Sequence, residues 1–493
     1  MTERAWMIRR ALLAVALMAG FYVLAVGIAV GLLLIPYGEW QLLHRVHLKI
    51  AAVCIGGAGA ILWAIMPRPD KFEAPGPALT REKTPKLFAM VDEIAAATKQ
   101  PLPSEVFLLN EVNAWVTYRG GVMGFGSHRV MGIGLPLLQA LSVSELKAVL
   151  AHEFGHYVSG DVSIGPWIYK TRAAIGRAIQ GLNESMLQTV FLWYGNMFLR
   201  LTQAVSRRQE YIADEIAAKL AGADAMKNAL RRVAALSPAH NVYLSQEVLP
   251  VMNSGFLPPV AAGFERFIAG ANGSRWMSEV ASAEEQSGET DEFDSHPCLK
   301  DRLQALDAVH ADPQVQDNAP ATTLLPNPEH HARSVLSFVI GSDQLRELKA
   351  IQWDQVGSAV YEPSWRAMLK HYTKLLDPMT TDTIPQDRKG FAMLGSRLVD
   401  ADEGTVAEEI RIARAVYLLT AAIGIVLADA GWKVSTSPGE PVKVTLGDDT
   451  FDPREALQQL AANQMSAQQW RELCERMGIS NKALLSADTS SKT

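Results

Sequence analysis

The sequence predicts a mainly α-helical membrane protein in three parts: a transmembrane hairpin, a helical central domain with a small β-hairpin or sheet beside its main helix, and a separate α+β region. Two apolar runs near the N-terminus predict the hairpin. Apolar residues at helical spacing predict the central helices, and two proline-rich stretches mark linkers. The predicted boundaries are 1–66 for the hairpin, 67–84 and 311–328 for the linkers, 85–310 for the central domain and 329–493 for the C-terminal region.

The composition of the 493-residue chain limits the classes of function. Hydrophobic residues make up 48% and charged residues 20%, which is typical of a globular body with a membrane-embedded piece. Because the net charge is −6 and no basic stripe is present, we expect no nucleic-acid partner. The three cysteines lie far apart without a C-x-x-C pair, so neither a disulfide framework nor a thiolate zinc site is indicated.

The first apolar run, 11–35, contains 25 residues without a charge, enough to cross the roughly 30 Å hydrocarbon layer of a bilayer. A cleaved signal peptide is the alternative, but its apolar core would be shorter. The second run, 50–66, follows a polar turn expected around residues 36–40. We therefore expect two membrane spans, 11–35 and 50–66.

Basic residues gather at both outer flanks of this hairpin: Arg4, Arg9 and Arg10 precede it, and Arg68, Lys71, Arg81, Lys83 and Lys86 follow it. The loop from Pro36 to His47 has only Arg45. By the positive-inside rule both ends face the cytoplasm. The predicted location is a bacterial-type inner membrane, with several passes and a cytoplasmic central domain.

The first part of the central domain combines a helix with strands. Residues 85–99 have the pattern of an amphipathic helix, and 106–109 that of a short strand. Two β-like runs, 113–118 and 129–135, flank a glycine-rich turn and predict a β-hairpin. An exposed edge of this hairpin could bind an extended peptide as an added strand; the alternative is an ordinary pair of core strands.

The pentapeptide His152-Glu153-Phe154-Gly155-His156 has the spacing that a zinc site on a helix requires. Residues i and i+4 share a helix face, so His152 and His156 can bind one Zn²⁺ while Glu153 points at the open coordination position. Ser142 and Glu145 form a capping-box pattern at the start of this helix. The alternative is a pair of histidines with other partners on a half-buried helix.

A catalytic zinc site has three protein ligands and a water, and a carboxylate commonly supplies the third ligand. The helical segment 206–218 contains Glu210 and Asp214, four residues apart on one face. Glu210 could bind the metal while Asp214 accepts the free ring N–H of a ligand histidine. The alternative is a solvated, charged helix face. We expect one Zn²⁺ per chain.

Three motifs occur in order: His-Glu-Phe-Gly-His at 152–156, Glu-Tyr-Ile-Ala-Asp at 210–214, and Ser-His-Pro-Cys-Leu-Lys-Asp-Arg at 295–302. Together they resemble the signatures of the HtpX and CAAX-prenyl-protease family of membrane zinc endopeptidases, over about residues 85–310. The resemblance implies a zincin-like α+β metallopeptidase domain of the gluzincin type. It also implies the roles of four residues: His152, His156 and Glu210 as zinc ligands and Glu153 as the base.

HtpX-type proteins carry a second pair of membrane spans between the two metal-binding helices. In this chain the corresponding residues, 166–205, are interrupted by polar and charged side chains, among them Lys170, Arg172, Arg177 and Arg200. We therefore expect amphipathic helices on the bilayer surface in place of spans.

Asn113, His296 and Arg302 are candidates for contacting the substrate or the oxyanion of the reaction. The resemblance places residues 295–302 near the cleft, where a cationic or hydrogen-donating group must meet the oxyanion. For His296 and Arg302 the alternative is a helix start with a structural ion pair.

The C-terminal region carries no recognisable chemistry. We expect helices at 342–353 and 406–430, a β-hairpin at 432–446 and a helix capped by Asp452. The apolar run 415–428 is short for a membrane span and suits a buried helix.

These features predict a membrane-anchored, zinc-dependent endopeptidase, and the resemblance implies membrane or misfolded proteins as substrates. Zinc would lower the pKa of its bound water towards 7, and Glu153 would take the proton and pass it to the leaving amine. The alternative is a non-catalytic membrane scaffold with a structural metal and a C-terminal region that binds partners. The complete motif argues against it, because structural zinc sites normally have four protein ligands.

Overall fold

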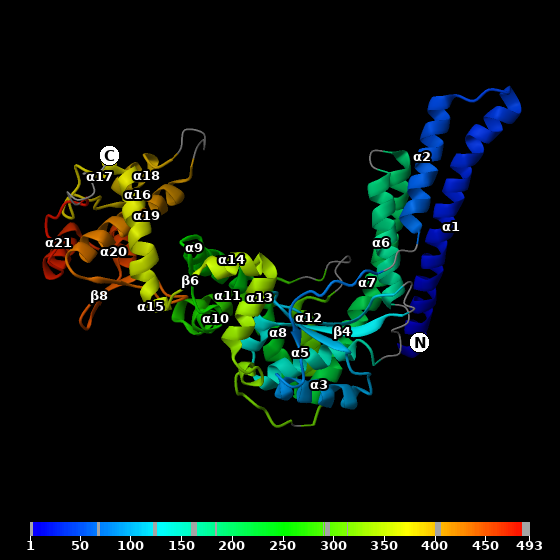
Figure 1. Ribbon diagram of the computed structural model, residues 1–493, viewed down its shortest axis with the longest axis horizontal. Coiled ribbons are helices and arrows are strands. Elements are labelled where there is room, and N and C mark those ends of the chain that lie inside the picture. The colour runs from blue at the N-terminus through cyan, green and yellow to red at the C-terminus, as the bar shows by residue number, and fades with distance from the viewer. Residues whose placement is uncertain are drawn as a thin grey trace. The chain divides into compact units, whose positions relative to one another are not determined.

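The chain folds mainly into helices with small sheets, which confirms the predicted fold class (Figure 1). The structure, a computed structural model, describes residues 3–66, 70–121, 126–158, 165–182, 185–288, 290, 296–312, 314–399 and 406–485. By packing, the chain divides into two units: Met1–Ser237 with Ser278–Val339, and Pro238–Met277 with Ile340–Thr493.

The grouping of residues 238–277 with the C-terminal residues differs from the expected boundaries at 85–310 and 329–493, which remain predictions. An aromatic cluster explains it. The ring of Tyr243 lies 5.3 Å from that of Phe264 and 6.2 Å from that of Trp353. The indole Nε1 of Trp353 donates to the Pro259 carbonyl at 3.0 Å. Residues distant in sequence thus share one apolar core.

The predicted pair of apolar N-terminal helices is confirmed as α1 (Glu3–Leu43) and α2 (Leu48–Ile65), with a turn at a different place. The expected turn at residues 36–40 is wrong, because α1 continues through Pro36 to Leu43. Prolines are more frequent in apolar, membrane-type helices than in helices of soluble proteins. The Glu39 carboxylate bonds the ring and backbone N–H of His47, which closes the shorter connection before α2.

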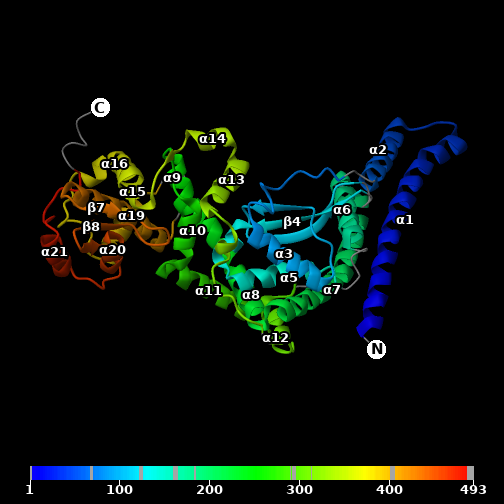
Figure 2. The ribbon, with the colours of Figure 1, turned by 60° about the horizontal axis from the view of Figure 1, so that its bottom comes forward.

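Two further helices, α6 (Gly165–Gly181) and α7 (Met186–Ala221), pack along α1 and α2 (Figures 1 and 2). Phe21 of α1 and Phe191 of α7 are fully buried, with ring centroids 6.1 Å apart. The hydroxyl of Tyr194 donates to the Leu17 carbonyl at 2.5 Å. The predicted helices in 166–205 therefore pack on the hairpin as one four-helix bundle.

Three described helices are long and apolar enough to cross a membrane: Leu12–Leu43, Leu48–Ile65 and Glu408–Asp429. The first two form the predicted hairpin. The third, α19 (Glu408–Asp429), has its centre buried in the core of the second unit, with Leu419 and Ile423 fully buried. This burial agrees with the expected buried helix at 415–428.

A four-stranded sheet with the order β1-β2-β4-β3 forms the β part of the first unit. Its strands are β1 (Ala78–Leu79), β2 (Glu105–Leu109), β3 (Ala114–Arg119) and β4 (His128–Gly134). β3 and β4 pair antiparallel, which confirms the predicted hairpin; part of its turn, 122–125, lies outside the described residues. β2 pairs parallel with β4, and β3 is an edge strand.

Further helices of the first unit are α3 (Pro85–Thr98), α4 (Leu135–Ala140), α5 (Val143–Gly155), α8 (Ala223–Val242), α11 (Ala271–Ser287), α12 (Leu299–Asp307) and α13 (Pro328–Ile340), of which α8, α11 and α13 continue into the second unit. Of these helices, α4 packs on β4 and α5 on β3, and Figure 2 shows α3 and α5 beside the sheet. α5 packs against α3, β3 and α7 and so lies at the centre of this unit.

The expected linker 311–328 packs on the start of α5. The carbonyls of Ala319 and Asp317 accept hydrogen bonds from the backbone N–H groups of Val143 and Ser144, at 2.9 and 3.1 Å. The Ser144 hydroxyl accepts one from the Asp317 N–H at 2.8 Å. These carbonyls satisfy N–H groups that have no partner within the helix. A short 3₁₀ helix, Ala321–Leu324, follows.

The second unit is built around α19. Its other helices are α9 (Leu249–Asn253), α10 (Val260–Ala269), α14 (Ser342–Glu347), α15 (Trp353–Val356), α16 (Glu362–His371), α17 (Thr373–Leu376), α18 (Arg388–Ser396), α20 (Pro453–Ala461) and α21 (Ala467–Arg476), with π-helical turns at Tyr243–Val248 and Gly357–Tyr361. Its strands are β5 (Phe256–Leu257), β6 (Lys349–Ala350), β7 (Lys433–Ser435), β8 (Lys443–Leu446) and β9 (Asp449–Phe451).

Predictions for this unit have mixed outcomes. The hairpin at 432–446 is confirmed by antiparallel β7 and β8, and the Asp452 carboxylate caps α20. The single helix expected at 342–353 is wrong, because α14 ends at Glu347 and β6 follows. β6 pairs with β5, a contact distant in sequence, and this pairing interrupts the helix.

Candidate metal centre

The helix α5 begins at the predicted capping box and ends at the predicted ligands. The Ser142 hydroxyl accepts from the Glu145 N–H at 3.2 Å, and the Glu145 carboxylate accepts from the Ser142 N–H at 2.8 Å. Leu150 and Phe154 are fully buried beneath the helix. His156 is the C-terminal cap of α5. It lies one turn after His152, on the same face of the helix.

A close approach of α5 and α7 brings the third ligand candidate to the histidines. A Cβ atom on Gly155 would lie 3.0 Å from the Cα of Ala213 in α7. Only glycine lets the two backbones come this near. Ala213 lies between Glu210 and Asp214, so the contact sets the position of both carboxylates.

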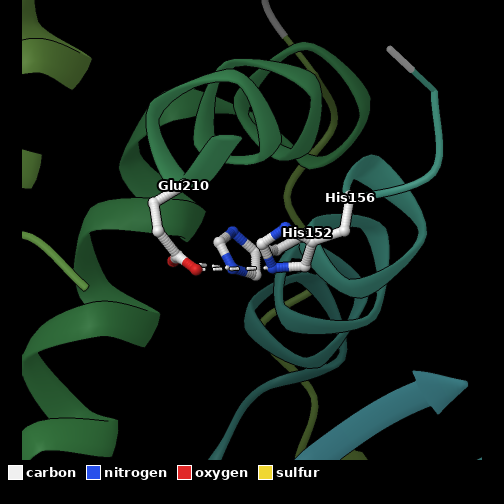
Figure 3. Close-up of side chains that lie close together, drawn as sticks. All are labelled: His152, His156 and Glu210. Atoms are coloured by element: carbon white, nitrogen blue, oxygen red, sulfur yellow. Dashed lines mark ion pairs between the residues drawn. The ribbon is translucent and has the colours of Figure 1, made fainter. Parts of the chain in front are cut away.

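The side chains of His152, His156 and Glu210 converge, as Figure 3 shows. One ligand atom from each lies within 4.8 Å of the others. The Nε2 atom of His152 is 3.4 Å from Oε2 of Glu210, and the Nε2 atom of His156 is 3.6 Å from Oε1. The two imidazole rings meet edge to face, with centroids 4.7 Å apart.

These residues fit a zinc ion. Two ligands bound at about 2.05 Å with tetrahedral angles lie about 3.3 Å apart, close to the separations of 3.4 and 3.6 Å. The Oε2 atom of Glu210 is buried without a hydrogen-bond partner among the described residues. A buried carboxylate oxygen without such a partner is costly unless a cation meets it. Two imidazole nitrogens and one carboxylate oxygen are also the donor set of many catalytic zinc sites.

Asp214 contacts the ring of His152, and Arg302 in turn binds Asp214. The Oδ1 atom of Asp214 lies 2.9 Å from Nδ1 of His152, within reach of the predicted orienting contact. Arg302, from α12, donates from Nε and Nη2 to the two carboxylate oxygens of Asp214 at 2.9 and 2.6 Å. Asp214 is 1% exposed, so this chain of contacts is buried.

The two candidates from residues 295–302 both reach the centre, in different ways. The Nδ1 atom of His296 is 2.9 Å from Oε1 of Glu210, while its side chain is 64% exposed. The Nη2 atom of Arg302 is 3.7 Å from Oε2 of Glu210, but both of its carboxylate bonds go to Asp214. This geometry favours the structural alternative for Arg302 and leaves His296 open to solvent.

Burial and neighbouring charges shift the pKa values of the centre in different directions. Burial acts to lower the pKa of His152, but the carboxylates of Asp214 and Glu210 raise it to about 9. Burial and the neighbouring His152 lower the pKa of His156 to about 4. Burial raises the pKa of Glu153 to about 7. Although burial acts to raise the pKa of Glu210, the neighbouring imidazoles of His152 and His296 hold it well below its ordinary value.

Asn113 makes only backbone hydrogen bonds among the described contacts of this region. It is exposed just before β3, where its backbone carbonyl accepts from the Gly134 N–H at 2.8 Å. Among the described residues, no hydrogen bond or ion pair links it to the two histidines or to Glu210. Its role as a substrate contact remains a prediction.

Sequence reasoning missed three features of the centre. The bidentate pairing of Arg302 with Asp214 joins residues 88 positions apart, and no local pattern indicates it. The requirement for glycine at 155 comes from a helix that is distant in sequence. Tyr157 donates to a carbonyl of β3, and the only signal was its place next to the motif.

Comparisons with known proteins agree with this geometry. The sequence model of Peptidase family M48 matches residues 81–310. A protein named Protease HtpX homolog, from a Sulfurihydrogenibium species, is 31% identical over 198 residues, which cover 34% of this chain and 63% of the relative. Protease HtpX of Pseudomonas fluorescens is 28% identical over 218 residues, which cover 40% of this chain and 64% of the relative. The chain thus spans a little under two thirds of the length of these relatives.

No solved structure matches the chain. The family match, the HtpX relatives and the order of the three motifs agree on the same segment. Residues 81–310 are therefore similar to peptidase family M48 and to the HtpX proteases.

Proposed function

We propose that this protein is a membrane-anchored, zinc-dependent endopeptidase. The observation that carries the proposal is the convergence of one ligand atom each from His152, His156 and Glu210 within 4.8 Å of one another. The cluster contains three described protein ligands, which leaves one tetrahedral position for water or substrate. That count supports a catalytic site over the closed four-ligand site of a structural scaffold.

The mechanism assigns the proton transfers to Glu153. A bound zinc ion would polarise the scissile carbonyl and acidify a water molecule. Glu153 accepts the proton of the attacking water and returns it to the leaving amine. A pKa raised by burial to about 7 suits a group that both accepts and donates a proton near neutral pH.

The remaining polar residues hold this arrangement in place. Asp214 fixes the ring of His152 so that its Nε2 faces the metal position, and Arg302 holds Asp214. His296 is exposed and 2.9 Å from Glu210, so it can donate to the oxyanion that forms at the scissile carbonyl.

The outer edge of β3 supports a mode of substrate binding. Gly134 N–H donates to the Asn113 carbonyl, one of the two bonds of a hydrogen-bonded pair, at the end of the β3–β4 ladder. Because such pairs alternate along an antiparallel ladder, the N–H and C=O groups of Ala114, Val116 and Tyr118 point away from β4. α5 packs against β3, so this edge lies beside the metal centre. An extended peptide can pair with it through backbone atoms, which gives little sequence preference.

Unfolded or membrane-inserted proteins on the cytoplasmic side are the proposed substrates. Extended segments of such proteins offer free backbone N–H and C=O groups to the β3 edge. The basic flanks of α1 and α2 support a cytoplasmic orientation, and the apolar bundle of α1, α2, α6 and α7 supports membrane attachment.

The test compares three preparations of the full chain in detergent. Zinc-loaded wild type should cleave an unstructured casein-type substrate, and a chelator should stop the cleavage. Glu153→Gln should retain the metal, measured by elemental analysis, and lose cleavage. Retention of both zinc and activity by Glu153→Gln would exclude this mechanism.

A further inference from the structure

One acceptor on the outer edge of β3 is already bound. The hydroxyl of Tyr157 donates a hydrogen bond to the Val116 carbonyl at 2.6 Å. Val116 is the middle residue of the three whose backbone groups point to that edge, between Ala114 and Tyr118. A peptide strand that pairs along the whole edge needs the same carbonyl for its own N–H.

Several contacts hold Tyr157 in this place. The guanidinium of Arg129 lies 4.6 Å from the centre of the Tyr157 ring and 4.8 Å from that of Phe154. Arg129 is 4% exposed, and its Nη1 donates to the Pro101 carbonyl at 2.9 Å. The Tyr157 carbonyl accepts from Nε2 of Gln100 at 3.0 Å. The tyrosine is therefore fixed from two sides, with its hydroxyl aimed at the strand.

We propose that Tyr157 is a specificity-determining residue, which closes the centre of the β3 edge until an extended peptide displaces its hydroxyl. The proposal rests on the proposed function, because it takes the β3 edge as the surface that binds substrate. The β3 edge therefore selects substrates by the length of the extended segment that can pair with it. A segment that pairs on both sides of Val116 can replace the lost bond, whereas a short or folded segment cannot.

Removing the Tyr157 hydroxyl should change the free energy of peptide binding to the β3 edge. In Tyr157→Phe the ring can keep its stacking on Arg129, but the Val116 carbonyl loses its donor. Val116 is 5% exposed, so its carbonyl is poorly hydrated in the free enzyme. A substrate N–H then gains a full partner without displacing one. We expect peptide binding to tighten by about 2- to 12-fold, the range for one net hydrogen bond.

The experiment separates binding from chemistry. Full-length, zinc-loaded protein is compared as wild type and Tyr157→Phe, with kcat and KM measured on a fluorogenic casein-derived peptide. The same substitution is placed in the Glu153→Gln background, and the dissociation constant of a fluorescein-labelled peptide is measured by anisotropy. Tyr194→Phe is the matched control, because it removes a hydroxyl that donates to a backbone carbonyl in the helical bundle.

The expected result is a lower KM and a lower dissociation constant for Tyr157→Phe, with kcat and zinc content unchanged and no such effect of Tyr194→Phe. An unchanged or raised dissociation constant would overturn the proposal, and so would a fall in kcat, since the hydroxyl would then assist the reaction. Suppose that the wild type does not cleave, but that Tyr157→Phe still tightens peptide binding in the Glu153→Gln background. The role of Tyr157 in closing the β3 edge would then stand, and the proposed function would fail. Absence of peptide binding both with Glu153 present and in the Glu153→Gln background would overturn the proposed role of Tyr157.

A peptide scan adds a second measurement. N-methylation removes one substrate N–H at a time along the peptide. At the position that faces Val116, methylation should weaken binding to Tyr157→Phe more than binding to the wild type, because only the variant depends on that N–H. No position with such a difference would contradict the assignment of Val116.

Discussion

Replacing Asp214 by asparagine tests how the metal centre is held together. The carboxylate lies 2.9 Å from Nδ1 of His152 and accepts two bonds from Arg302. Asparagine keeps the size of the side chain but removes its charge. The ring of His152 then loses the carboxylate proposed to orient it, and the guanidinium of Arg302 loses its buried, charged partner.

The two losses have different magnitudes and different readouts. Loss of an orienting carboxylate typically weakens metal binding 10- to 100-fold, which is about 1.4 to 2.8 kcal/mol. Removal of one member of a buried ion pair costs about 3 to 5 kcal/mol of stability. Because Arg302 also lies 3.7 Å from Glu210, part of its charge remains compensated, so we expect the lower end of that range.

The assay is a zinc titration in competition with a fluorescent chelator, together with thermal unfolding of the zinc-loaded protein. Glu210→Ala removes a ligand and should lower zinc affinity more than Asp214→Asn does. Glu215→Gln is the control, since Glu215 is the next residue of the same helix and pairs with Lys219 at the surface. If Asp214→Asn released the metal while Glu210→Ala retained it, the assigned roles would be reversed. Wild-type affinity in Asp214→Asn would refute the orienting role.

Three further predictions follow from the structure. Gly155→Ala should lower both stability, by about 1 to 3 kcal/mol, and zinc content, because the added Cβ meets the Ala213 backbone at 3.0 Å; Gly176→Ala, with nothing within 4 Å of its added Cβ, should do neither. Burial lowers the pKa of His240 to about 4, below its ordinary 6.5, so the unfolded chain takes up the proton first as the pH falls. The contribution of His240 to the stability of the second unit should therefore be largest above pH 6.5. Between pH 6.5 and pH 4 the free energy of unfolding should fall by up to about 1.4 kcal/mol per pH unit. Denaturant titrations at several pH values should show a smaller slope for His240→Leu. Chelation of zinc should abolish cleavage while circular dichroism keeps its helical signal, and added zinc should restore activity; a cooperative loss of helix on chelation would instead indicate a structural metal.

The parts of the centre that sequence reasoning predicted are those with local patterns. The capping box at Ser142, the four-residue spacing of the histidines and that of Glu210 and Asp214 all lie within single helices. Helical periodicity alone assigns each pair to one face. The pairing of β3 with β4 was also within reach, because a glycine-rich turn joins them.

The parts that were missed depend on contacts between distant segments. The helix expected at 342–353 fails because β6 pairs with β5, about 90 residues earlier. Arg302 meets Asp214 across two helices, and no pattern around either residue indicates the other. The turn expected at Pro36 fails for a different reason: proline usually ends helices in water, whereas α1 is a long apolar helix that continues through Pro36, as apolar membrane-type helices can.

The length of α7 has a practical consequence. Tyr194 contacts α1 in the bundle, and Glu210, 16 positions further along α7, contacts the histidines, so about 24 Å of unbroken helix separates them. Because α7 is a continuous helix, a tilt of its first half within the bundle would displace Glu210 at the proposed metal centre. Solubilising agents that match or mismatch the bilayer thickness should therefore alter cation retention, and purification in nanodiscs of defined acyl length is the natural starting point for biochemical work.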